Sequence, residues 1–510
     1  MAKAIGIDLG TTYSAVAVLR ETGTPEILPN RDGEDITPSV VLIQEIGGRV
    51  EPLVGTMAKH SAASAPEDVV QFVKRQMGNP SWRFDSPGGE SYTAEEISAI
   101  ILKRLKEDAE LALGEPVRDA VITVPAYFDD ARRTATQHAG RIAGLNVLRV
   151  LNEPTAAALS FGLDTSAEGI VLVYDLGGGT FDVTLLKITD GEFEVLGTDG
   201  DRNLGGFDFD NRLMEYVAGK IEAEGGPDLL EEPAQVVMLR EKVEMAKRSL
   251  TTVATTMIHV SAGGRPFRVQ VERSEFERIT ADLMSRTEDI TELVLEEAGY
   301  TWPRVDHVLL VGGSTRMPMV RALVERLAGR PVDRSVHPDE AVALGAAIQA
   351  AVEQSSVAGA DLAYLGGKPL VVDDVTSQAL GVITVGADLR TKINTIVVPR
   401  NTKVPAKMSE DLHTVHDNQT AVEVEVTEGE ETNPDYVVVV GSKTLPIPPY
   451  PAGAPVRVTY AYDIDQTVFV ELTDLTTGRS LGTFTVDRPA NLADAQLRAA
   501  EIKVSGLPVL

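Results

Sequence analysis

The feature that most constrains the fold is a turn of one design that occurs twice. The first copy is residues 8–12 (DLGTT), and the second is residues 175–180 (DLGGGT). Each copy follows an apolar, strand-like run and combines an aspartate, a glycine turn and a threonine at the exit. Because the copies are far apart in the chain, each can belong to its own lobe. The repeat therefore predicts a duplicated α/β core with a nucleotide held between two lobes.

The residue types in this turn suit a polyphosphate and its metal. Glycine lets backbone N–H groups approach phosphate oxygens, because no Cβ stands in the way. Asp8 and Asp175 suit Mg²⁺, a hard ion that keeps several waters and is held by one or two carboxylates plus phosphate. A single Asp-x-Gly-Thr turn is most often a hairpin. Two copies at domain spacing favour a site for ATP or ADP with Mg²⁺.

Charge and composition narrow the class of partner. The 510 residues include 47 Lys and Arg against 76 Asp and Glu, a formal charge of −29, and no cysteine. Such a chain repels nucleic acid and anionic lipid, and it has no disulfides or thiol chemistry. The start has no long apolar run or cleavage site, and no stretch reaches membrane-spanning length. We expect a cytoplasmic protein without nucleic-acid or membrane partners.

The pattern of apolar residues and the composition of the chain change near residue 355. Up to that point strand-like runs alternate with amphipathic helical stretches, which predicts an α/β domain over residues 1–354. Strands are expected at 121–124 and 147–151, and helices at 94–111 and 236–249. Residues 355–374 are a linker rich in Gly, Ala and Ser that ends in the apolar stretch 369–374. We interpret that stretch as a movable joint, with an extra edge strand as the alternative.

The remainder alternates in the manner of a β-sheet. Val422, Val424 and Val426 are interleaved with glutamates, which predicts an antiparallel β-sandwich over residues 375–489. Residues 490–510 begin with a short helical stretch, 491–500, and end in the apolar tail 506–510 (GLPVL).

Several ordered strings identify a family. They are VPAYF at 124–128, GRIAGL at 140–145, NEPTAAA at 152–158, LGG at 204–206, HVLLVGGSTRMP at 307–318 and PDEAVA at 338–343. Together with the two turns, they resemble the 70-kDa heat-shock protein family, the DnaK-type chaperones, closely over residues 3–351. The resemblance implies a two-lobed ATPase domain of the actin and hexokinase type, followed by a β-sandwich that binds extended apolar segments of unfolded proteins.

Roles then carry over to matching positions. Asp8 and Asp175 would hold Mg²⁺ through water. Lys74 would orient the attacking water and the γ-phosphate, and Glu153 and Asp182 would position that water. The catalytic set implied by the resemblance is Lys74, Glu153, Asp175, Thr180 and Asp182. The nucleotide-binding set is Asp8, Gly10, Thr11, Thr12, Tyr13, Gly177, Gly178, Gly179, Gly205, Gly206, Glu244, Lys247, Arg248, Gly312, Gly313, Ser314, Arg316 and Asp339.

The residues themselves agree with an ATP hydrolase. Phosphoryl transfer asks mainly for positioning and charge neutralisation, and this set supplies both without a covalent nucleophile. No acceptor pocket is evident, so water is the expected acceptor.

The resemblance is looser in the β-domain. It implies a peptide groove lined by Val382, Thr384, Val385, Leu412, Val415, Val422 and Val424. The alternative is that these residues are ordinary sandwich core. The family's helical lid would begin near Leu492, where the chain soon ends, so we expect a lidless groove. The apolar tail 507–510 is a candidate occupant of that groove, and a frayed terminus is the alternative.

The chain also departs from the family pattern. Asp373 stands where an aliphatic linker residue is usual, which predicts weaker docking of the linker on the ATPase domain. Phe207 stands where an acid is usual. The region 78–92 is shorter than in bacterial relatives, which puts an exchange-factor contact in doubt. Arg149 and Asp374 match positions where relatives meet J-domain partners.

Three other functions stay open at this stage. A dedicated partner-binding ATPase without refolding activity would keep the same site. A small-molecule kinase shares the duplicated turns, but it has no evident use for a β-domain. An actin-like filament protein would polymerise with ATP.

Overall fold

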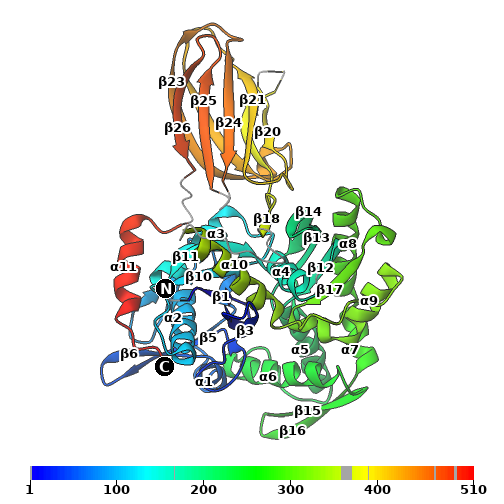
Figure 1. Cartoon of the computed structure of the whole chain (residues 1–510). Coiled ribbons are helices and arrows are strands. Elements are labelled where there is room, and N and C mark those ends of the chain that lie inside the picture. Colours follow the sequence, from blue (N-terminus) through cyan, green and yellow to red (C-terminus); the bar gives the residue numbers. More distant parts are fainter. Residues whose placement is uncertain are drawn as a thin grey trace.

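The computed structural model describes residues 3–165, 167–357, 370–386, 388, 390–463, 467–486 and 491–510. A two-lobed α/β body carries a β-sandwich at one end (Figure 1). The first part of the predicted linker, residues 358–369, lies outside the described residues, as do 487–490. Among the described helices, none combines the length and the apolar character needed to cross a membrane.

The first lobe, which we call lobe I, is built on a mixed sheet. Its strand order is β11-β10-β1-β2-β3, and β4 pairs with β2. The strands are β1 (Ile5–Asp8), β2 (Tyr13–Leu19), β3 (Pro25–Ile27), β4 (Thr37–Pro38), β10 (Asp119–Val124) and β11 (Asn146–Asn152). Strand β1 runs antiparallel to β2 and parallel to β10. The turn at residues 8–12 therefore joins two adjacent strands at the sheet centre.

Smaller elements complete lobe I. A three-stranded sheet, a short hairpin and three helices pack around the main sheet. They are β5 (Val40–Ile46), β6 (Arg49–Val54), β7 (Val69–Gln71), β8 (Phe84–Asp85), β9 (Ser91–Tyr92), α1 (Thr56–Ser61), the 3-10 helix η1 (Val73–Gln76), α2 (Ala94–Leu113) and α3 (Asp130–Ile142). Helix α2 begins at a capping box in which Thr93 and Glu96 bond each other's backbone N–H. The predicted helix and strands in this lobe are confirmed.

The second lobe, lobe II, repeats the design. Its sheet has the order β17-β12-β13-β14, and β12 again runs antiparallel to the next strand and parallel to a later one. The elements are β12 (Gly169–Leu176), β13 (Phe181–Thr189), β14 (Glu192–Asp201), β15 (Thr255–Ala262), β16 (Arg265–Glu272), β17 (His307–Val311), α5 (Gly206–Ala223), α6 (Pro233–Ser249), α7 (Arg273–Ile279), α8 (Ala281–Glu297), η2 (Trp302–Arg304), η3 (Gly313–Arg316) and α9 (Pro318–Ala328). The predicted duplication is thus present in the strand pairing.

Two helices rich in small residues pack between the lobes. They are α4 (Glu153–Thr165) and α10 (Ala341–Val357). A Cβ on Gly345 would lie 1.7 Å from the carbonyl oxygen of Ala156, and one on Gly6 would lie 2.0 Å from the backbone nitrogen of Ala347. The absence of side chains there lets backbone meet backbone, which fixes the spacing of the two sheets.

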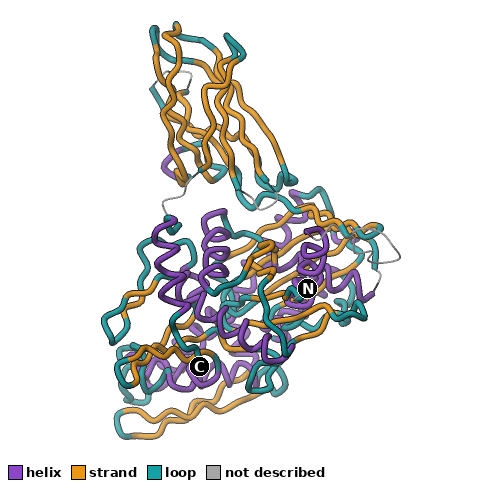
Figure 2. Tube along the Cα trace, turned by 60° about the vertical axis from the view of Figure 1, so that its left-hand side comes forward, coloured by secondary structure: helices purple, strands orange, loops and turns teal. Residues whose placement is uncertain are grey.

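The β-sandwich consists of two four-stranded antiparallel sheets. Their orders are β20-β19-β22-β23 and β21-β24-β25-β26. The strands are β19 (Leu380–Val385), β20 (Lys392–Val398), β21 (Ala406–His413), β22 (Gln419–Glu428), β23 (Val438–Tyr450), β24 (Pro455–Tyr462), β25 (Val468–Asp474) and β26 (Arg479–Thr485), with a 3-10 turn η4 (Pro434–Tyr436). Alternate residues of β24 are buried in a core of valine, leucine and tyrosine side chains. The predicted sandwich is confirmed (Figure 2).

The end of the linker forms an edge strand. Strand β18 (Val371–Asp373) pairs in parallel with Glu192–Glu194 of β14, so it extends the lobe II sheet. Val372 is buried beside α4, whereas Val371 is exposed. Residues 371–373 therefore form the edge strand that was the alternative interpretation of this segment. The unpaired edge of β14 provides hydrogen-bonding partners for their backbone.

The C-terminal segment does not enter the sandwich. Helix α11 (Asp494–Ser505) packs on α3 and α2 of lobe I, and the tail follows the edge of β6 (Figure 1). Leu497, Ala500 and Val504, spaced three and four residues apart, are buried in the lobe I core. The backbone of Leu510 donates to Pro52 O and accepts from Val54 N, both at 2.9 Å. The hypothesis that the tail occupies its own groove is therefore wrong, because lobe I offers both an apolar surface and an open strand edge.

Candidate functional site

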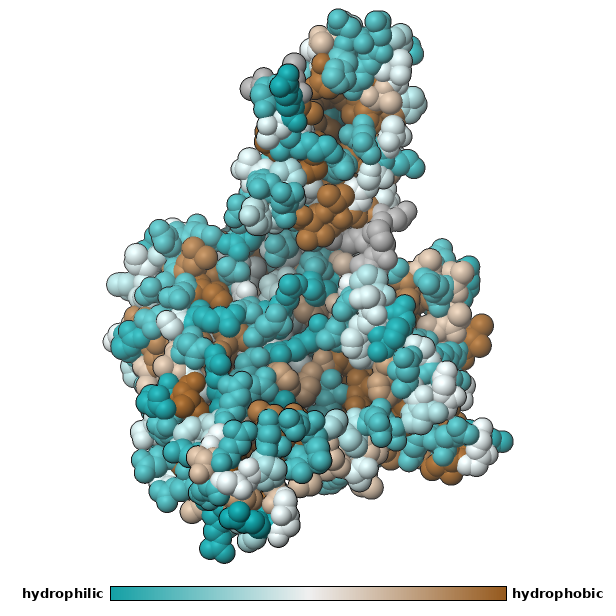
Figure 3. All heavy atoms as spheres, turned by 180° about the vertical axis from the view of Figure 1, so that it is seen from behind, coloured by the Kyte–Doolittle hydropathy of each residue, from teal (hydrophilic) through white to brown (hydrophobic). Residues whose placement is uncertain are grey.

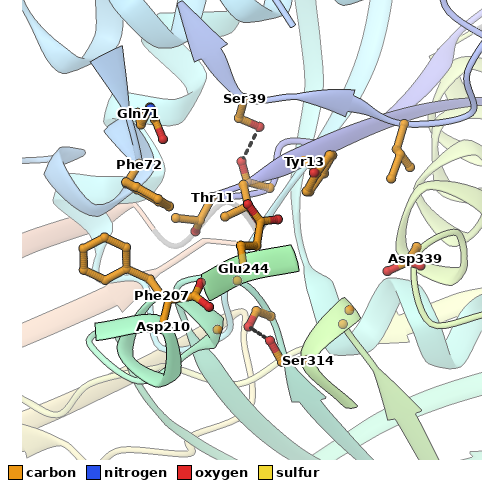
Figure 4. A pocket seen from close by; sticks show the side chains of 18 of the residues that line it. Thr11, Tyr13, Ser39, Gln71, Phe72, Phe207, Asp210, Glu244, Ser314 and Asp339 are labelled. Carbon is orange, nitrogen blue, oxygen red and sulfur yellow. Dashed lines mark hydrogen bonds between the residues drawn. The ribbon is translucent and has the colours of Figure 1, made fainter. Parts of the chain in front are cut away.

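The two duplicated turns face each other across a cleft. A Cβ on Gly178 would lie 2.1 Å from Thr12 Oγ1, and one on Gly179 would lie 2.4 Å from Thr11 Cγ2. The turns are thus in contact through glycine backbone and threonine side chains. They border a cavity of about 590 Å³ between the lobes, a size that suits a nucleotide (Figure 4).

Most of the predicted nucleotide residues line this cavity. The predicted residues found in its wall are Asp8, Gly10, Thr11, Thr12, Tyr13, Lys74, Glu153, Asp175, Gly177, Gly178, Thr180, Gly206, Glu244, Lys247, Arg248, Gly312, Gly313, Ser314, Arg316 and Asp339. Gly179, Gly205 and Asp182 are not in the wall. Gly205 packs directly on Gly179, where a Cβ would lie 2.6 Å from its backbone. Gly205 therefore packs behind the turn, whereas Gly179, which is part of the turn, faces Thr11.

Four carboxylates meet at the floor of the cleft. Burial, with the charge of Glu153 next in importance, raises the pKa of Asp8 to about 7. The same two causes raise the pKa of Asp175 and of Asp182 well above the usual range. Buried carboxylates that repel one another favour a bound cation. Within the described residues, no group of three or more acidic or histidine side chains could hold a metal by itself.

Lys74 lies among these acids. It comes from η1, is buried, and forms an ion pair with Glu153. Its charge lowers the pKa values of Asp8, Asp175 and Asp182, against the effect of burial. A lysine that sequence pattern alone would place on a surface is therefore an interior cation in the fold.

The two carboxylate oxygens of Asp182 differ in their hydrogen bonding. Its Oδ1 accepts a hydrogen bond from Ala126 N at 2.9 Å. Its Oδ2 is buried and has no hydrogen-bond partner in the described part of the chain. An unmet buried acceptor beside Glu153 suits a water molecule.

Cross-lobe contacts close one side of the cleft. Lys59 of α1 pairs with Glu244 of α6 at 2.9 Å, and its ammonium donates to Tyr13 OH at 3.0 Å. Arg248 also donates to Tyr13 OH, at 2.8 Å. Sequence reasoning predicted Tyr13, Glu244 and Arg248 but missed Lys59. No motif marks Lys59, and only the fold brings α1 to α6.

Backbone and side chains of lobe II form the opposite wall. Ser314 Oγ donates to Gly177 O at 2.8 Å, and Lys247 bonds Gly206 O at 2.9 Å and Asp210 at 2.8 Å. Gly312 has a φ of 82°, and a Cβ there would lie 2.5 Å from Asp175 Oδ1, so no other residue fits. Asp210 was missed, although it lies one helical turn after Gly206.

The predicted groove residues divide into two groups. Val382 and Val424 are each 1% exposed and lie in the sandwich core. The other five are partly or largely exposed: Thr384, Val385, Leu412, Val415 and Val422. On the face seen in Figure 3, hydrophobic side chains gather in a few patches on the sandwich within a largely hydrophilic surface.

The sandwich is joined to the cleft by polar contacts. Asn152, next to Glu153, donates its amide to both carboxylate oxygens of Asp374, at 2.7 and 2.8 Å. Arg400 pairs with Asp199 at 3.0 Å and with Glu297 at 2.6 Å. Arg149 is only 5% exposed and lies 3.4 Å from Glu353, so its guanidinium does not face solvent.

Asp373 has a partner. Its carboxylate lies 2.5 Å from the ammonium of Lys403, which follows Arg400 in the loop between β20 and β21. The acid that departs from the family pattern is therefore compensated by a lysine of the sandwich.

Comparison with known proteins agrees with this architecture. The family model described as "Hsp70 protein" matches residues 4–499. Proteins named "Chaperone protein DnaK" from Thermotoga neapolitana, Thermotoga petrophila and Thermotoga maritima are each 44% identical over 486 residues. Each match covers 93% of this chain and 79% of the relative. The chain, with its paired phosphate turns and its appended sandwich, belongs to the Hsp70 protein family.

Proposed function

We propose that this protein is an ATP-dependent molecular chaperone. The two lobes, residues 1–354, act as an ATPase domain of the actin and hexokinase type. Residues 355–374 connect it to a substrate-binding sandwich, residues 375–489, and residues 490–510 form a helix and tail. Membership of the Hsp70 family and the names of its DnaK relatives support this function.

The acids at the floor fit a hydrated magnesium ion. Asp8 and Asp175 line the cavity and carry raised pKa values, as expected of carboxylates whose charge is not yet met. Mg²⁺, when bound, neutralises charge on the phosphates. Thr11, Thr12, Thr180 and the backbone of Gly178 are the proposed donors to phosphate oxygens, while Gly177, whose N–H donates to Thr180 O at 3.0 Å, lines the cavity. The site therefore offers carboxylates for the metal ion and hydrogen-bond donors for the phosphates.

Lys74, Glu153 and Asp182 act on the attacking water. Glu153 and Asp182 accept hydrogen bonds from it and orient it, and one of these carboxylates takes the single proton that the water loses on attack, while Lys74 supplies positive charge toward the γ-phosphate. The adenosine lies against Gly312, Gly313 and Ser314, with Glu244, Lys247, Arg248, Arg316 and Asp339 around it. Arg316 is held by Asp339 at 2.6 Å.

One observation carries the link to the sandwich. Asn152 immediately precedes Glu153, and its amide is bonded to Asp374 at the end of the linker. Strand β18 also extends the sheet whose strand β13 bears Asp182. A shift of Glu153 or of this sheet on hydrolysis thus reaches the linker through direct contacts.

Apolar segments of unfolded proteins are the proposed substrate. Five residues that are at least partly exposed are the candidates for the groove: Thr384, Val385, Leu412, Val415 and Val422. Burying three or four aliphatic side chains yields about 5–12 kcal/mol before ordering costs, so binding of roughly micromolar to millimolar strength is expected. A J-domain protein and an exchange factor are proposed partners. Contact of a J-domain with Arg149 requires that Arg149 leave Glu353.

The test is ATP turnover with and without a leucine-rich heptapeptide. We expect the peptide to raise turnover in the wild type and to leave it unchanged in Asp374→Ala, which cuts the bond to Asn152. Asp411→Ala, an exposed acid paired with Arg457 in the sandwich, is the matched control and should respond as the wild type does. Stimulation that survives in Asp374→Ala contradicts this route.

Peptide binding itself separates the chaperone from a dedicated partner-binding ATPase. The fluorescence anisotropy of a labelled heptapeptide should rise with the wild type and respond to ATP. Equal binding by Val422→Phe, or no response to ATP, contradicts the proposed groove.

A further inference from the structure

An aromatic and cationic cluster spans the cleft beside the nucleotide cavity. Phe72 of lobe I and Phe207 of lobe II have ring centres 4.5 Å apart in an edge-to-face arrangement. Both rings line the cavity, on the side away from Asp339 (Figure 4). This contact joins the lobes at a position that has no role in the phosphate chemistry described above.

Two guanidinium groups flank the Phe207 ring. The guanidinium carbon of Arg75 lies 4.8 Å from the ring centre, and that of Arg240 lies 4.2 Å away. Both distances are within the range of cation–π attraction. Arg75 comes from lobe I and Arg240 from lobe II, so the ring is attracted to cations on both sides of the cleft.

The cations are held in place by other groups. Arg75 donates to Gly179 O at 2.6 and 3.0 Å and pairs with Asp208 at 2.6 Å. Arg240 donates to Asn211 Oδ1 at 2.9 Å. Asn211 and Arg240 both belong to lobe II, so this guanidinium is oriented whether or not the lobes are closed. Gly179 and Asp208 also belong to lobe II, so the contacts of Arg75 with them cross the cleft and add to those of the ring.

The backbone of Phe72 supports the same interpretation. Its φ of 59° and ψ of 26° lie in the left-handed region, which is rare for an aromatic residue. Such a conformation persists where the surroundings hold it, and it is concentrated at ligand clamps and switch regions. Here it aims the ring across the cleft at Phe207.

We propose that Phe72, Arg75, Phe207 and Arg240 form a cation–aromatic clasp that holds the lobes closed and sets the rate of nucleotide release. This inference rests on the proposed nucleotide site. The lobes must separate for a nucleotide to leave, and separation breaks the contacts of Phe207 with Phe72 and with Arg75. The contacts of the uncharged Phe207 ring depend little on salt, whereas the Arg75–Asp208 ion pair is screened by salt, as an acid in place of Phe207 would be.

The experiment measures release of a fluorescently labelled ADP, chased with excess unlabelled ADP, at low and high salt. Phe207→Ala should release ADP about tenfold faster than the wild type, as expected when the ring pair with Phe72 and the cation–π contact with Arg75, which both cross the cleft, are lost. Phe207→Leu should also release faster, because it keeps apolar volume without a π face. Phe207→Tyr should stay within about twofold of the wild type, because the ring is restored.

Phe207→Glu supplies a second, charge-based readout. It should release ADP slowly at low salt, and added salt should accelerate its release several-fold more than that of the wild type, in which the Arg75–Asp208 pair is screened. Phe469→Ala, which removes an exposed ring from the sandwich, is the matched control and should behave as the wild type does. Unchanged release in Phe207→Ala, or equal release in Phe207→Leu and the wild type, overturns the clasp. Failure of the wild type to bind labelled ADP would instead overturn the nucleotide site.

Discussion

The nucleotide cleft buries charge, whereas the β-sandwich buries hydrocarbon. At the floor of the cleft, Asp8, Glu153, Asp175 and Asp182 surround the single ammonium of Lys74. In the sandwich, Val424, Val458, Tyr460 and Val470 belong to a core cluster of valine, leucine and tyrosine side chains. The first region is costly for the empty protein, and the second is its main source of local stability.

This difference shows which region requires particular residues at particular positions. In the proposed function, repelling buried carboxylates are tolerated because a bound cation relieves the repulsion, so the cleft is specified by chemistry at fixed positions. A valine core is specified only by volume and alternation, and many sequences satisfy it. The following predictions test this contrast, from the largest expected effect to the smallest.

Thr180→Ala should lower ATP turnover by about a hundredfold, because a donor to the transferred phosphoryl group is lost. Single-turnover hydrolysis with prebound ATP measures the chemical step. Thr189→Ala, at the far exposed end of β13, is the control and should retain wild-type turnover. Turnover of Thr180→Ala within a few-fold of the wild type would mean that the site is assigned incorrectly.

Val424→Ala should destabilise the sandwich by about 1.5–3 kcal/mol, because a fully buried valine is truncated and a cavity remains. Val422→Ala, two residues along the same strand and partly exposed, should cost under about 1 kcal/mol but weaken peptide binding. Urea unfolding and peptide anisotropy measure the two effects. If Val424→Ala weakens peptide binding at unchanged stability, Val424 belongs to the groove and not to the core.

Asp175→Asn should raise the melting temperature of the nucleotide-free protein by about 2–4 °C. Burial and neighbouring acids raise the pKa of Asp175, so the folded state loses stability as pH rises from the unfolded pKa toward the folded one. The amide removes that loss at neutral pH. The gain should vanish below about pH 4, near the ordinary pKa of an aspartate, where both states bind the proton. Calorimetry at neutral pH and below about pH 4 measures the gain in melting temperature under the two conditions. An equal gain at the two pH values would exclude ionisation of Asp175 as its cause.

Lys403→Glu should weaken the coupling between peptide and ATPase by about twofold, because it places an acid against Asp373 and Glu194. The effect is small since these side chains are partly exposed and screened. The double variant Asp373→Lys with Lys403→Glu restores opposite charges and should recover the coupling. Peptide-stimulated turnover at low salt is the measurement. If the double variant does not recover, the Asp373–Lys403 ion pair does not contribute to the coupling.

The sequence alone predicted many of the residues that line the proposed nucleotide cavity. Asp8, Asp175 and the glycines beside them could be assigned because a polyphosphate with its metal demands particular residue types next to a strand end. The alternation of Val422, Val424 and Val426 likewise determined that the second domain is a sheet. These features are local, and local patterns follow from backbone geometry.

Only the tertiary structure decided which surfaces those elements meet. Lys59 reaches Glu244, Lys403 neutralises Asp373, and α11 packs on lobe I, although no pattern in the sequence joins these segments. An amphipathic helix or an apolar strand shows that it needs a partner, but its own residues do not identify that partner. The choice depends on which apolar face and which open strand edge the folded chain brings within reach.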